Sequence, residues 1–345
     1  MYLFIGPASN PVTGQSTAFD LLVRSKFKKV STFLCFPTNK SVVSNLLFIA
    51  KVLGKLYRMK PSVVYLSISR TKVGFLRDYM IITMARFHNC KIVVHLHGSD
   101  FSRFVEESRT IFKYLIFSVY NKVDRAIVLS DQMKSQFSAF PMIDLIVVPN
   151  TVLVPDYILP RDLKGNSLKI GYLSNLIPSK GLAELIAAVK HCVSEGMELE
   201  CYIAGGSGFD LEFDYKIFSD IKLCEYIHYL GTIKDLEKWH FLVNIDVLIL
   251  PSYYPTEAQP LCLLEAASVG KHIVFTNINS LDSSFGIFNR SLIKCRDPAS
   301  ISSAIKKLYE NRTILVDSKN QNIQIFENHY SFQKHISLIE QSLSF

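Results

Sequence analysis

Short runs of apolar and β-branched residues alternate with longer helical patterns along the whole chain. Strands that alternate with helices in this way pair in parallel, with helices covering both faces of the sheet. The run at 245–250, apolar apart from Asp246, fits a strand that is buried on both faces. We expect strands near 2–5, 30–36, 62–67, 91–96, 124–129 and 145–148, and again near 168–173, 199–204, 226–230, 245–250 and 272–276.

The chain of 345 residues is long enough for two domains of about 100–200 residues each. Three prolines, Pro149, Pro155 and Pro160, and the polar run 164–167 indicate a linker between the two sets of predicted strands, which we place at 151–166. The predicted fold class is therefore α/β, with two doubly wound parallel-sheet (Rossmann-like) domains facing each other across a cleft. We place these domains at 1–150 and 167–326.

Composition excludes several classes of protein. Apolar residues make up 49% of the chain and charged residues 20%, which excludes a disordered tail or a collagen-like repeat. No apolar run reaches the ~18 residues of a membrane span, and residues 1–6 are typical of a first strand rather than a signal peptide. The seven cysteines form no C-x-x-C pair, which favours reduced thiols and a cytoplasmic location over a disulfide framework or a zinc site.

The positive charge is concentrated in the first half. Residues 1–150 hold 20 basic and 8 acidic side chains, a net of +12, whereas residues 151–345 hold 18 and 22, a net of −4. An anionic partner of the first half is therefore expected, either nucleic acid or the anionic inner face of a membrane. Basic residues on an apolar helix, and large apolar residues around Lys113, favour peripheral membrane contact, although a solvated basic face with an apolar core stripe explains them as well. These residues are Lys51, Lys55, Arg58, Lys60, Phe112, Tyr114, Leu115 and Phe117.

Ligands bind beyond the carboxyl ends of the strands in open parallel sheets, so the loops at those ends are the candidate sites. The first such loop contains Gly14, which permits close approach of a ligand to the backbone, and Ser16 or Thr17 as helix caps. After the fourth strand, His97 lies two residues beyond His95, on the same face. A metal site at this pair is disfavoured because only Asp100 lies nearby as a further ligand; a histidine satisfied in the core is the alternative.

Two loops of the second half carry features typical of anion binding. Lys180 lies at or just before the start of a helix, where the macrodipole disfavours a cation unless an anion binds beside it. Gly205 belongs to the glycine-rich turn 204–208 that follows a strand, although such a turn on its own is weak evidence.

The segment 250–270 is the most informative. Pro260 suits the first position of a helix and Gly270 the position after its end, so we expect a helix over about 260–269. Glu257 then precedes the helix and Glu265 lies within it, while the first-turn amides of residues 261–263 have no partner in the helix. Two carboxylates flanking free amides can hold a polyhydroxylated anion, with the hydroxyls on the carboxylates and phosphate on the amides.

These loops together resemble those of retaining GT-B glycosyltransferases of the glycosyl transferases group 1 family, over nearly the whole chain. The most specific part of the resemblance is the E-x7-E element, Glu257 to Glu265. Weaker motifs support it at residues 11–14, 97–98, 128–130, 148–150, 179–181 and 204–206. The last segment, 327–345, resembles the family's final helix, which crosses back to the first domain.

The resemblance implies a nucleoside-diphosphate sugar donor on the second domain and a saccharide acceptor on the basic first domain. We expect this acceptor to be polyprenyl-diphosphate-linked. It implies that Lys180 neutralises the leaving diphosphate, that Glu257 binds the donor sugar and Glu265 the ribose, and that His97 approaches the sugar. Further donor contacts are implied at Gly14, Asn175, Gly205, Ala258, Gln259, Leu261 and Cys262. The family commonly has Arg at the position of Asn175, so dependence on Lys180 should be strong.

The expected activity is hexosyl transfer with retention, in synthesis of a bacterial surface polysaccharide of the O-antigen or capsule type. We expect no cofactor, no metal and no nucleic-acid partner, since the sequence has no D-x-D cluster in a suitable loop and no recognised nucleic-acid motif. A GT-B sugar-nucleotide epimerase or phosphorylase, and a non-catalytic sugar-nucleotide-binding subunit, remain open as alternatives.

Overall fold

The computed structural model describes residues 1–345 except 10–12, 38–40, 159–164, 209 and 280. It divides into two compact units, one of Met1–Thr151 with Phe332–Phe345 and one of Val152–Ser331. Part of the predicted linker, 159–164, lies outside the described residues. The predicted last segment, 327–345, is shared: its first residues end a helix of the second unit, and the chain joins the first unit at Phe332.

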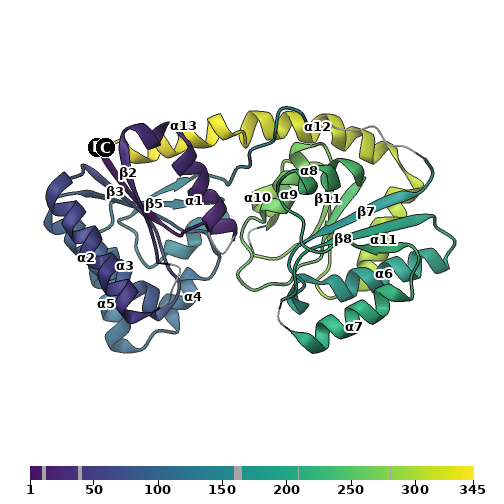
Figure 1. Cartoon of the computed structure of the whole chain (residues 1–345), viewed down its shortest axis with the longest axis horizontal. Coiled ribbons are helices and arrows are strands. Elements are labelled where there is room, and N and C mark those ends of the chain that lie inside the picture. The colour runs from purple at the N-terminus through teal and green to yellow at the C-terminus, as the bar shows by residue number, and fades with distance from the viewer. Residues whose placement is uncertain (10–12, 38–40, 159–164, 209, 280) are drawn as a thin grey trace. The chain divides into compact units, whose positions relative to one another are not determined.

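The first unit contains a six-stranded sheet with helices on both faces (Figure 1). Every strand pair in it is parallel, as predicted. Its strands are β1 (Tyr2–Gly6), β2 (Ser31–Cys35), β3 (Val63–Ser67), β4 (Lys91–His95), β5 (Arg125–Val128) and β6 (Asp144–Val147). Its helices are α1 (Gly14–Arg24), η1 (Lys26–Lys29), α2 (Val42–Met59), α3 (Lys72–Phe87), α4 (Phe101–Glu106), α5 (Thr110–Tyr120), η2 (Gln132–Phe137) and α13 (Phe332–Leu343).

The second unit contains another six-stranded parallel sheet. Its strands are β7 (Leu168–Leu173), β8 (Leu199–Ala204), β9 (Ile227–Tyr229), β10 (Val247–Leu250), β11 (His272–Thr276) and β12 (Arg290–Ile293). Its helices are η3 (Pro178–Lys180), α6 (Leu182–Ser194), α7 (Leu211–Lys222), α8 (Asp235–Asn244), α9 (Leu261–Ser268), α10 (Leu281–Phe285), α11 (Pro298–Glu310) and α12 (Thr313–His329). The predicted strands are all present, so the α/β class with two parallel sheets is confirmed, and β12 is an additional strand.

Strand order locates the ligand-binding edge of each sheet. In the first unit the order is β2-β1-β3-β4-β5-β6, and in the second it is β12-β11-β10-β7-β8-β9. The connections reverse direction between β1 and β3, and between β7 and β10. Ligands of doubly wound sheets bind beyond the carboxyl ends of the strands at such a reversal. The loops after β7 and β10 are therefore the expected ligand-binding loops of the second unit.

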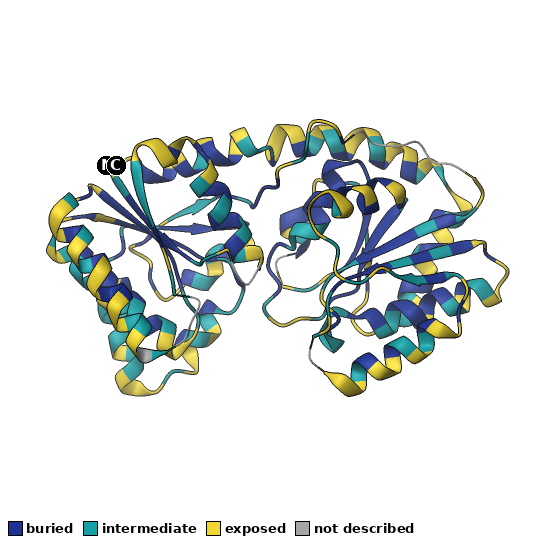
Figure 2. Ribbon diagram, in the orientation of Figure 1, coloured by how far each residue is buried: buried dark blue, intermediate teal, exposed yellow. Residues whose placement is uncertain are grey.

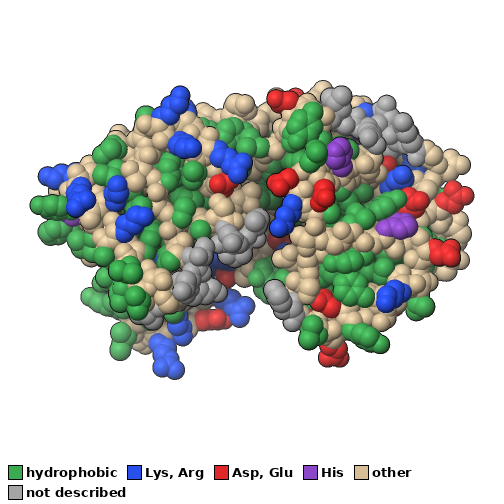
Figure 3. Space-filling model, in the orientation of Figure 1, with side chains coloured by type: hydrophobic (Ala, Val, Ile, Leu, Met, Phe, Trp, Pro, Cys, Tyr) green, Lys and Arg blue, Asp and Glu red, His purple; other side chains and the backbone are tan. Residues whose placement is uncertain are grey.

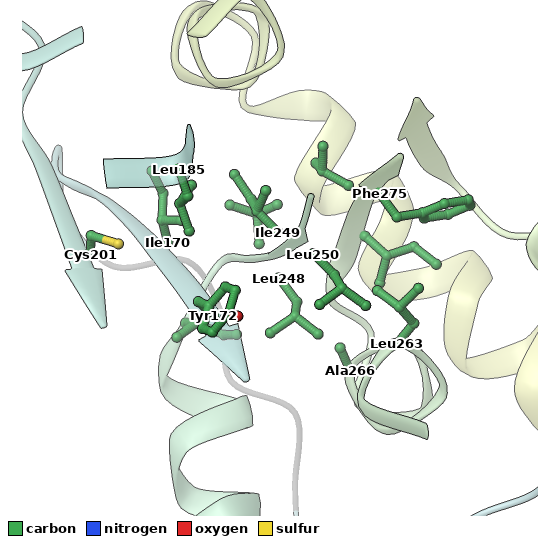
Figure 4. Close-up of a cluster of buried hydrophobic side chains, with 14 of the residues drawn as sticks. Ile170, Tyr172, Leu185, Cys201, Leu248, Ile249, Leu250, Leu263, Ala266 and Phe275 are labelled. Atoms are coloured by element: carbon green, nitrogen blue, oxygen red, sulfur yellow. The ribbon is translucent and has the colours of Figure 1, made fainter. Parts of the chain in front are cut away.

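Apolar side chains on both faces of each sheet hold the helices in place, and the strands are the most buried part of each unit (Figure 2). In the second unit, Leu248 and Leu250 of β10 lie with Tyr172 of β7 and Leu263 of α9 in one buried cluster (Figure 4). This packing ties α9, which carries Glu265, to the strand whose loop carries Glu257. The glutamates are thus positioned by the core.

The last helix, α13, belongs to the first unit. Ile336, Ile339 and Leu343 pack into the cluster that contains Phe4 of β1. The Arg125 guanidinium also donates a hydrogen bond to the carbonyl oxygen of Ser342 over 2.8 Å. The chain therefore passes between the units twice, near residue 151 and near residue 331.

Candidate active site in the second unit

The loop after β7 carries Lys180 and is fixed by its neighbour after β10. Gly181 adopts a left-handed conformation with φ +76°, and a Cβ there would lie 2.1 Å from the carbonyl oxygen of Pro251. The amide of Tyr253 donates a hydrogen bond to the carbonyl oxygen of Ser179 over 2.8 Å. Lys180 directly precedes Gly181, the N-cap of α6, as predicted. The two loops thus hold each other at the edge of the sheet.

Lys180 and Glu257 form a buried ion pair. The Lys180 Nζ lies 2.5 Å from Glu257 Oε2, and the two side chains are only 15% and 10% exposed. Ser252 donates a hydrogen bond to the same carboxylate oxygen over 2.8 Å. The Lys180 ammonium also lies 4.7 Å from the centre of the Tyr254 ring. The predicted anion-binding lysine and sugar-binding glutamate are therefore in direct contact, a pairing that the sequence did not indicate.

Helix α9 begins one residue later than predicted. Pro260 has φ −61° and ψ 125°, so it is the N-cap and the helix starts at Leu261; Gly270, with φ +76°, ends it as predicted. No side chain caps this first turn. The prediction that the amide of Leu263 has no partner is wrong, because this amide donates to the carbonyl oxygen of Pro260 over 3.3 Å. The amides of Leu261 and Cys262 remain as the candidate anion donors of α9.

Glu265 is 6% exposed and is paired with Lys238 of α8. Each glutamate of the E-x7-E element thus has its own lysine. Between them lies Cys262, whose pKa is raised to about 12 by burial, and the charges of Glu265, Glu257 and Lys180 also act on this thiol. These three charged groups therefore lie near the Cys262 thiol at the start of α9, and this thiol stays protonated at neutral pH.

The remaining predicted residues of the second unit lie along the neighbouring loops. Gly205 follows β8 with φ +158°, and a Cβ there would lie 1.8 Å from the carbonyl oxygen of Ser174. The glycine therefore permits close contact with the loop that carries Asn175. Ala258 and Gln259 are 4% and 5% exposed, in the segment that joins Glu257 to α9.

His97 lies in the first unit. Its ring stacks on that of His95 with centroids 3.9 Å apart. Both ring nitrogens are buried, and neither has a hydrogen-bond partner among the described residues. Burial, with the charges of Arg70 and His335, lowers the pKa of His97 to about 3. His97 is therefore neutral at pH 7 and has hydrogen-bonding capacity to offer a ligand.

Gly14 is the first residue of α1, and a Cβ added there meets no atom within 4 Å. The prediction that Ser16 or Thr17 is the N-cap of α1 is wrong, because Thr13 is the N-cap. Ser16 forms a reciprocal capping box with Thr13. Residues 10–12 of this loop lie outside the described residues. Among the described residues nothing requires glycine at position 14, so close approach of a ligand remains a prediction.

Two site residues were not predicted. Lys238 lies on an amphipathic helix, where a lysine is typical of a solvated face, and Ser252 is one hydroxyl in a polar loop. Because Lys238 and Glu265 are 27 residues apart in the sequence, local patterns could not predict their contact. Among the described residues, no three His, Cys, Asp or Glu side chains form a metal-binding group.

Comparison with known proteins finds a family model that matches part of the chain. The family model described as glycosyl transferases group 1 matches residues 160–325. A curated Escherichia coli relative, UDP-Gal:alpha-D-GlcNAc-diphosphoundecaprenol alpha-1,3-galactosyltransferase, is 26% identical over 257 residues. The match covers 68% of this chain and 65% of the relative, so it spans slightly less than two thirds of the relative's length.

Solved structures show the same fold. Anabaena HepE in complex with UDP and glucose aligns with a TM-score of 0.72 and 14% identity, covering 99% of this chain and 98% of HepE. A glycosyltransferase from Rickettsia africae aligns with a TM-score of 0.75 and 16% identity, covering 99% of this chain and 97% of that one. At these identities the similarity concerns the fold.

Proposed function

We propose that the chain is a retaining glycosyltransferase of the glycosyl transferases group 1 family that uses a UDP-sugar, since the family model matches residues 160–325 and the fold is that of GT-B enzymes. The observation that carries the proposal is the arrangement after β7 and β10. There, Lys180, Glu257, the uncapped start of α9 and Glu265 meet at the strand reversal.

Each group has a role that follows from its charge. Cleavage of the bond between sugar and diphosphate leaves negative charge on the phosphate, and donors fixed in advance stabilise that charge. Lys180 and the amides of Leu261 and Cys262 supply such donors. Glu257 accepts hydrogen bonds from hydroxyls of the sugar, and Glu265 from those of the ribose. With Asn175 in place of the family's Arg, Lys180 carries the main positive charge.

Retention requires that the new bond forms on the sugar face that the diphosphate leaves. In the proposed step, the anomeric carbon loses the diphosphate oxygen and gains the acceptor oxygen, while a phosphate oxygen of the leaving group takes the acceptor proton. Glu257 and the neutral His97 bind sugar hydroxyls in this step. Anomeric analysis of the product by NMR tests it, because an inverted product contradicts it.

For the acceptor, we infer a saccharide linked to a polyprenyl diphosphate, in the synthesis of a bacterial surface polysaccharide. The support is the curated relative, whose name gives UDP-Gal as donor and a diphosphoundecaprenol-linked sugar as acceptor. An acceptor of this kind lies in a membrane, so an enzyme that uses it must reach the bilayer surface. Among the described residues, no helix is long and apolar enough to cross a membrane.

The first unit has a surface that suits peripheral membrane contact. Helices α2, α3 and α5 pack side by side and expose large apolar side chains between basic ones. No acidic residue occurs in α2 or α5, and the single acid of α3, Asp78, is buried against Arg77. The left part of Figure 3 shows apolar and basic side chains intermixed. The exposed apolar residues are Val43, Leu46, Leu47, Tyr57, Val73, Leu76, Met80, Phe87, Ile111 and Tyr114.

Apolar side chains with basic neighbours and no exposed acid fit an anionic lipid surface. Co-sedimentation with vesicles of phosphatidylglycerol and phosphatidylcholine at low salt tests this. We expect Leu46→Ser with Leu47→Ser to weaken binding. Leu211→Ser, which changes an even more exposed leucine of the second unit, should leave binding unchanged. Failure of the unmodified chain to sediment with the vesicles would refute the membrane contact.

The activity itself is tested with purified protein, a panel of labelled nucleotide sugars and lipid-linked acceptors. We expect a UDP-sugar to be consumed only when an acceptor is present, with release of UDP. Conversion of the donor without an acceptor would indicate an epimerase instead. Binding of the donor without either reaction would indicate a non-catalytic subunit.

A further inference from the structure

The two glutamates of the site differ in how their lysines reach them. Lys180 comes from the loop beside Glu257, whereas Lys238 comes from the first turn of α8 and contacts Glu265 Oε1. The side chain of Glu265 is 8% exposed and that of Lys238 is 27% exposed. Lys238 lies outside the E-x7-E element, and no role in the transfer described above has been assigned to it.

The position of Lys238 follows from the packing of α8. Trp239 and Leu242 are buried and anchor the helix on the core, so Lys238 lies at the border of the buried face. Its ammonium is 5.4 Å from the centre of the Trp239 ring, which restrains the long side chain. Because α8 contacts α9, the ammonium reaches the Glu265 carboxylate while part of it stays accessible to solvent.

We propose that Lys238 is a positioning residue that prepares Glu265 to recognise the ribose of the donor, an inference that rests on the proposed function. A carboxylate offers about four acceptor positions on its two oxygens. Lys238 occupies one of them, on Oε1, and Oε2 is left to accept the ribose hydroxyls. The ion pair also fixes the plane of the carboxylate and balances its charge before the donor arrives. Lys238 thus acts through Glu265 and does not touch the reacting atoms.

The test measures how strongly the protein distinguishes ribose from deoxyribose. Dissociation constants for UDP and for 2′,3′-dideoxy-UDP are obtained by isothermal titration calorimetry. We expect the unmodified protein to bind UDP about tenfold or more tightly than the dideoxy compound, since a hydrogen bond to a charged group is lost. Lys238→Met should reduce this ratio to about threefold or less, and Lys238→Arg should restore most of it.

Two further variants serve as controls. Lys234→Met removes an exposed lysine that precedes the same helix, and it should leave the ratio unchanged. Glu265→Gln should itself abolish most of the discrimination, and adding Lys238→Met to it should have no further effect. Circular dichroism verifies that each variant is folded. Lys238→Met should lower kcat/KM for the donor more than it lowers kcat, which is measured at saturating donor, because the contact with ribose contributes to donor binding.

The outcomes separate the inference from the function on which it rests. If the unmodified protein distinguishes ribose but Lys238→Met does so equally well, the positioning role is wrong and the donor site stands. If Lys238→Met binds UDP more tightly, Lys238 occupies the position of the ribose and is displaced by it, which also overturns the inference. If the unmodified protein binds neither nucleotide, the donor site itself is wrong.

Discussion

The Lys180–Glu257 pair predicts that stability and activity respond differently to the same substitutions. Lys180→Met leaves the Glu257 carboxylate buried beside Ser252 without its cation, and Glu257→Gln leaves the ammonium without its anion. Removal of one partner from a buried pair costs about 3–5 kcal/mol. With side chains 15% and 10% exposed, we expect about 3 kcal/mol for each single variant. The unit should remain folded at 25 °C, because stabilities of about 5–15 kcal/mol are usual.

The double variant should recover most of this loss, because it removes both charges together. The coupling free energy between the two substitutions should therefore be about 2 kcal/mol or more. Activity should not recover: kcat should fall by about 10²–10³-fold or more in both single variants and in the double variant, because the leaving diphosphate loses its charged donor or the sugar its acceptor.

Urea unfolding measures the stability of the second unit specifically. Trp239 is the only tryptophan in the sequence and is buried in this unit, so its fluorescence reports the unfolding of that unit. The Lys190–Asp220 pair, at 2.7 Å and about one third exposed, is the matched control. Its single variants should change stability by less than about 1 kcal/mol and leave kcat unchanged. Turnover at the unmodified rate in Lys180→Met would refute the role of this lysine in catalysis, and a coupling below about 0.5 kcal/mol would refute a stabilising ion pair.

Three more predictions concern other parts of the chain. Gly205→Ala should destabilise the second unit by several kcal/mol in urea unfolding, because its Cβ would lie 1.8 Å from the carbonyl oxygen of Ser174. Gly14→Ala should change the free energy of unfolding of the first unit by less than about 0.5 kcal/mol, because its Cβ meets no atom within 4 Å. The same variant should weaken donor binding, as expected for a donor that approaches the backbone there. Folding lowers the pKa of His97 from 6.5 to about 3, so between these pH values the unfolded chain binds a proton that the folded protein does not. The free energy of unfolding therefore has its full value above pH 6.5 and falls towards pH 3 by about 1.4 kcal/mol per pH unit. Amide exchange of β4 should show this slope and His97→Asn should reduce it; an unchanged slope would mean that His97 does not titrate in this way. Turnover should persist in excess EDTA because Lys180 and the α9 amides supply the charge, and loss of turnover that Mg²⁺ restores would refute this.

Local patterns predicted most of the fold, and long-range contacts account for what was missed. Buried strands such as β10 are recognisable because both of their faces are apolar. Strand β12 was missed because it is a short edge strand whose residues, Arg290 to Ile293, are mostly only partly buried. The start of α9 was displaced by one residue because the preferred φ of Pro260 suits both the cap and the first helical position.

The site shows the same division. Glu257, Glu265 and Lys180 were singled out as candidates by their spacing and by their positions in or just before predicted helices, which are local features. Their pairing could not be found, because Lys180 and Glu257 are 77 residues apart and meet only when β7 and β10 become neighbours in the sheet. Lys238 gave no signal, since a lysine on a helix surface is ordinary until the packing of α8 on α9 is known.

A crystal structure of the chain with a UDP-sugar would locate the donor. We expect the diphosphate within hydrogen-bonding distance of Lys180 Nζ and of the Leu261 and Cys262 amides, with the ribose hydroxyls on Glu265 and the sugar on Glu257. A donor bound away from the loops that follow β7 and β10 would contradict this expectation.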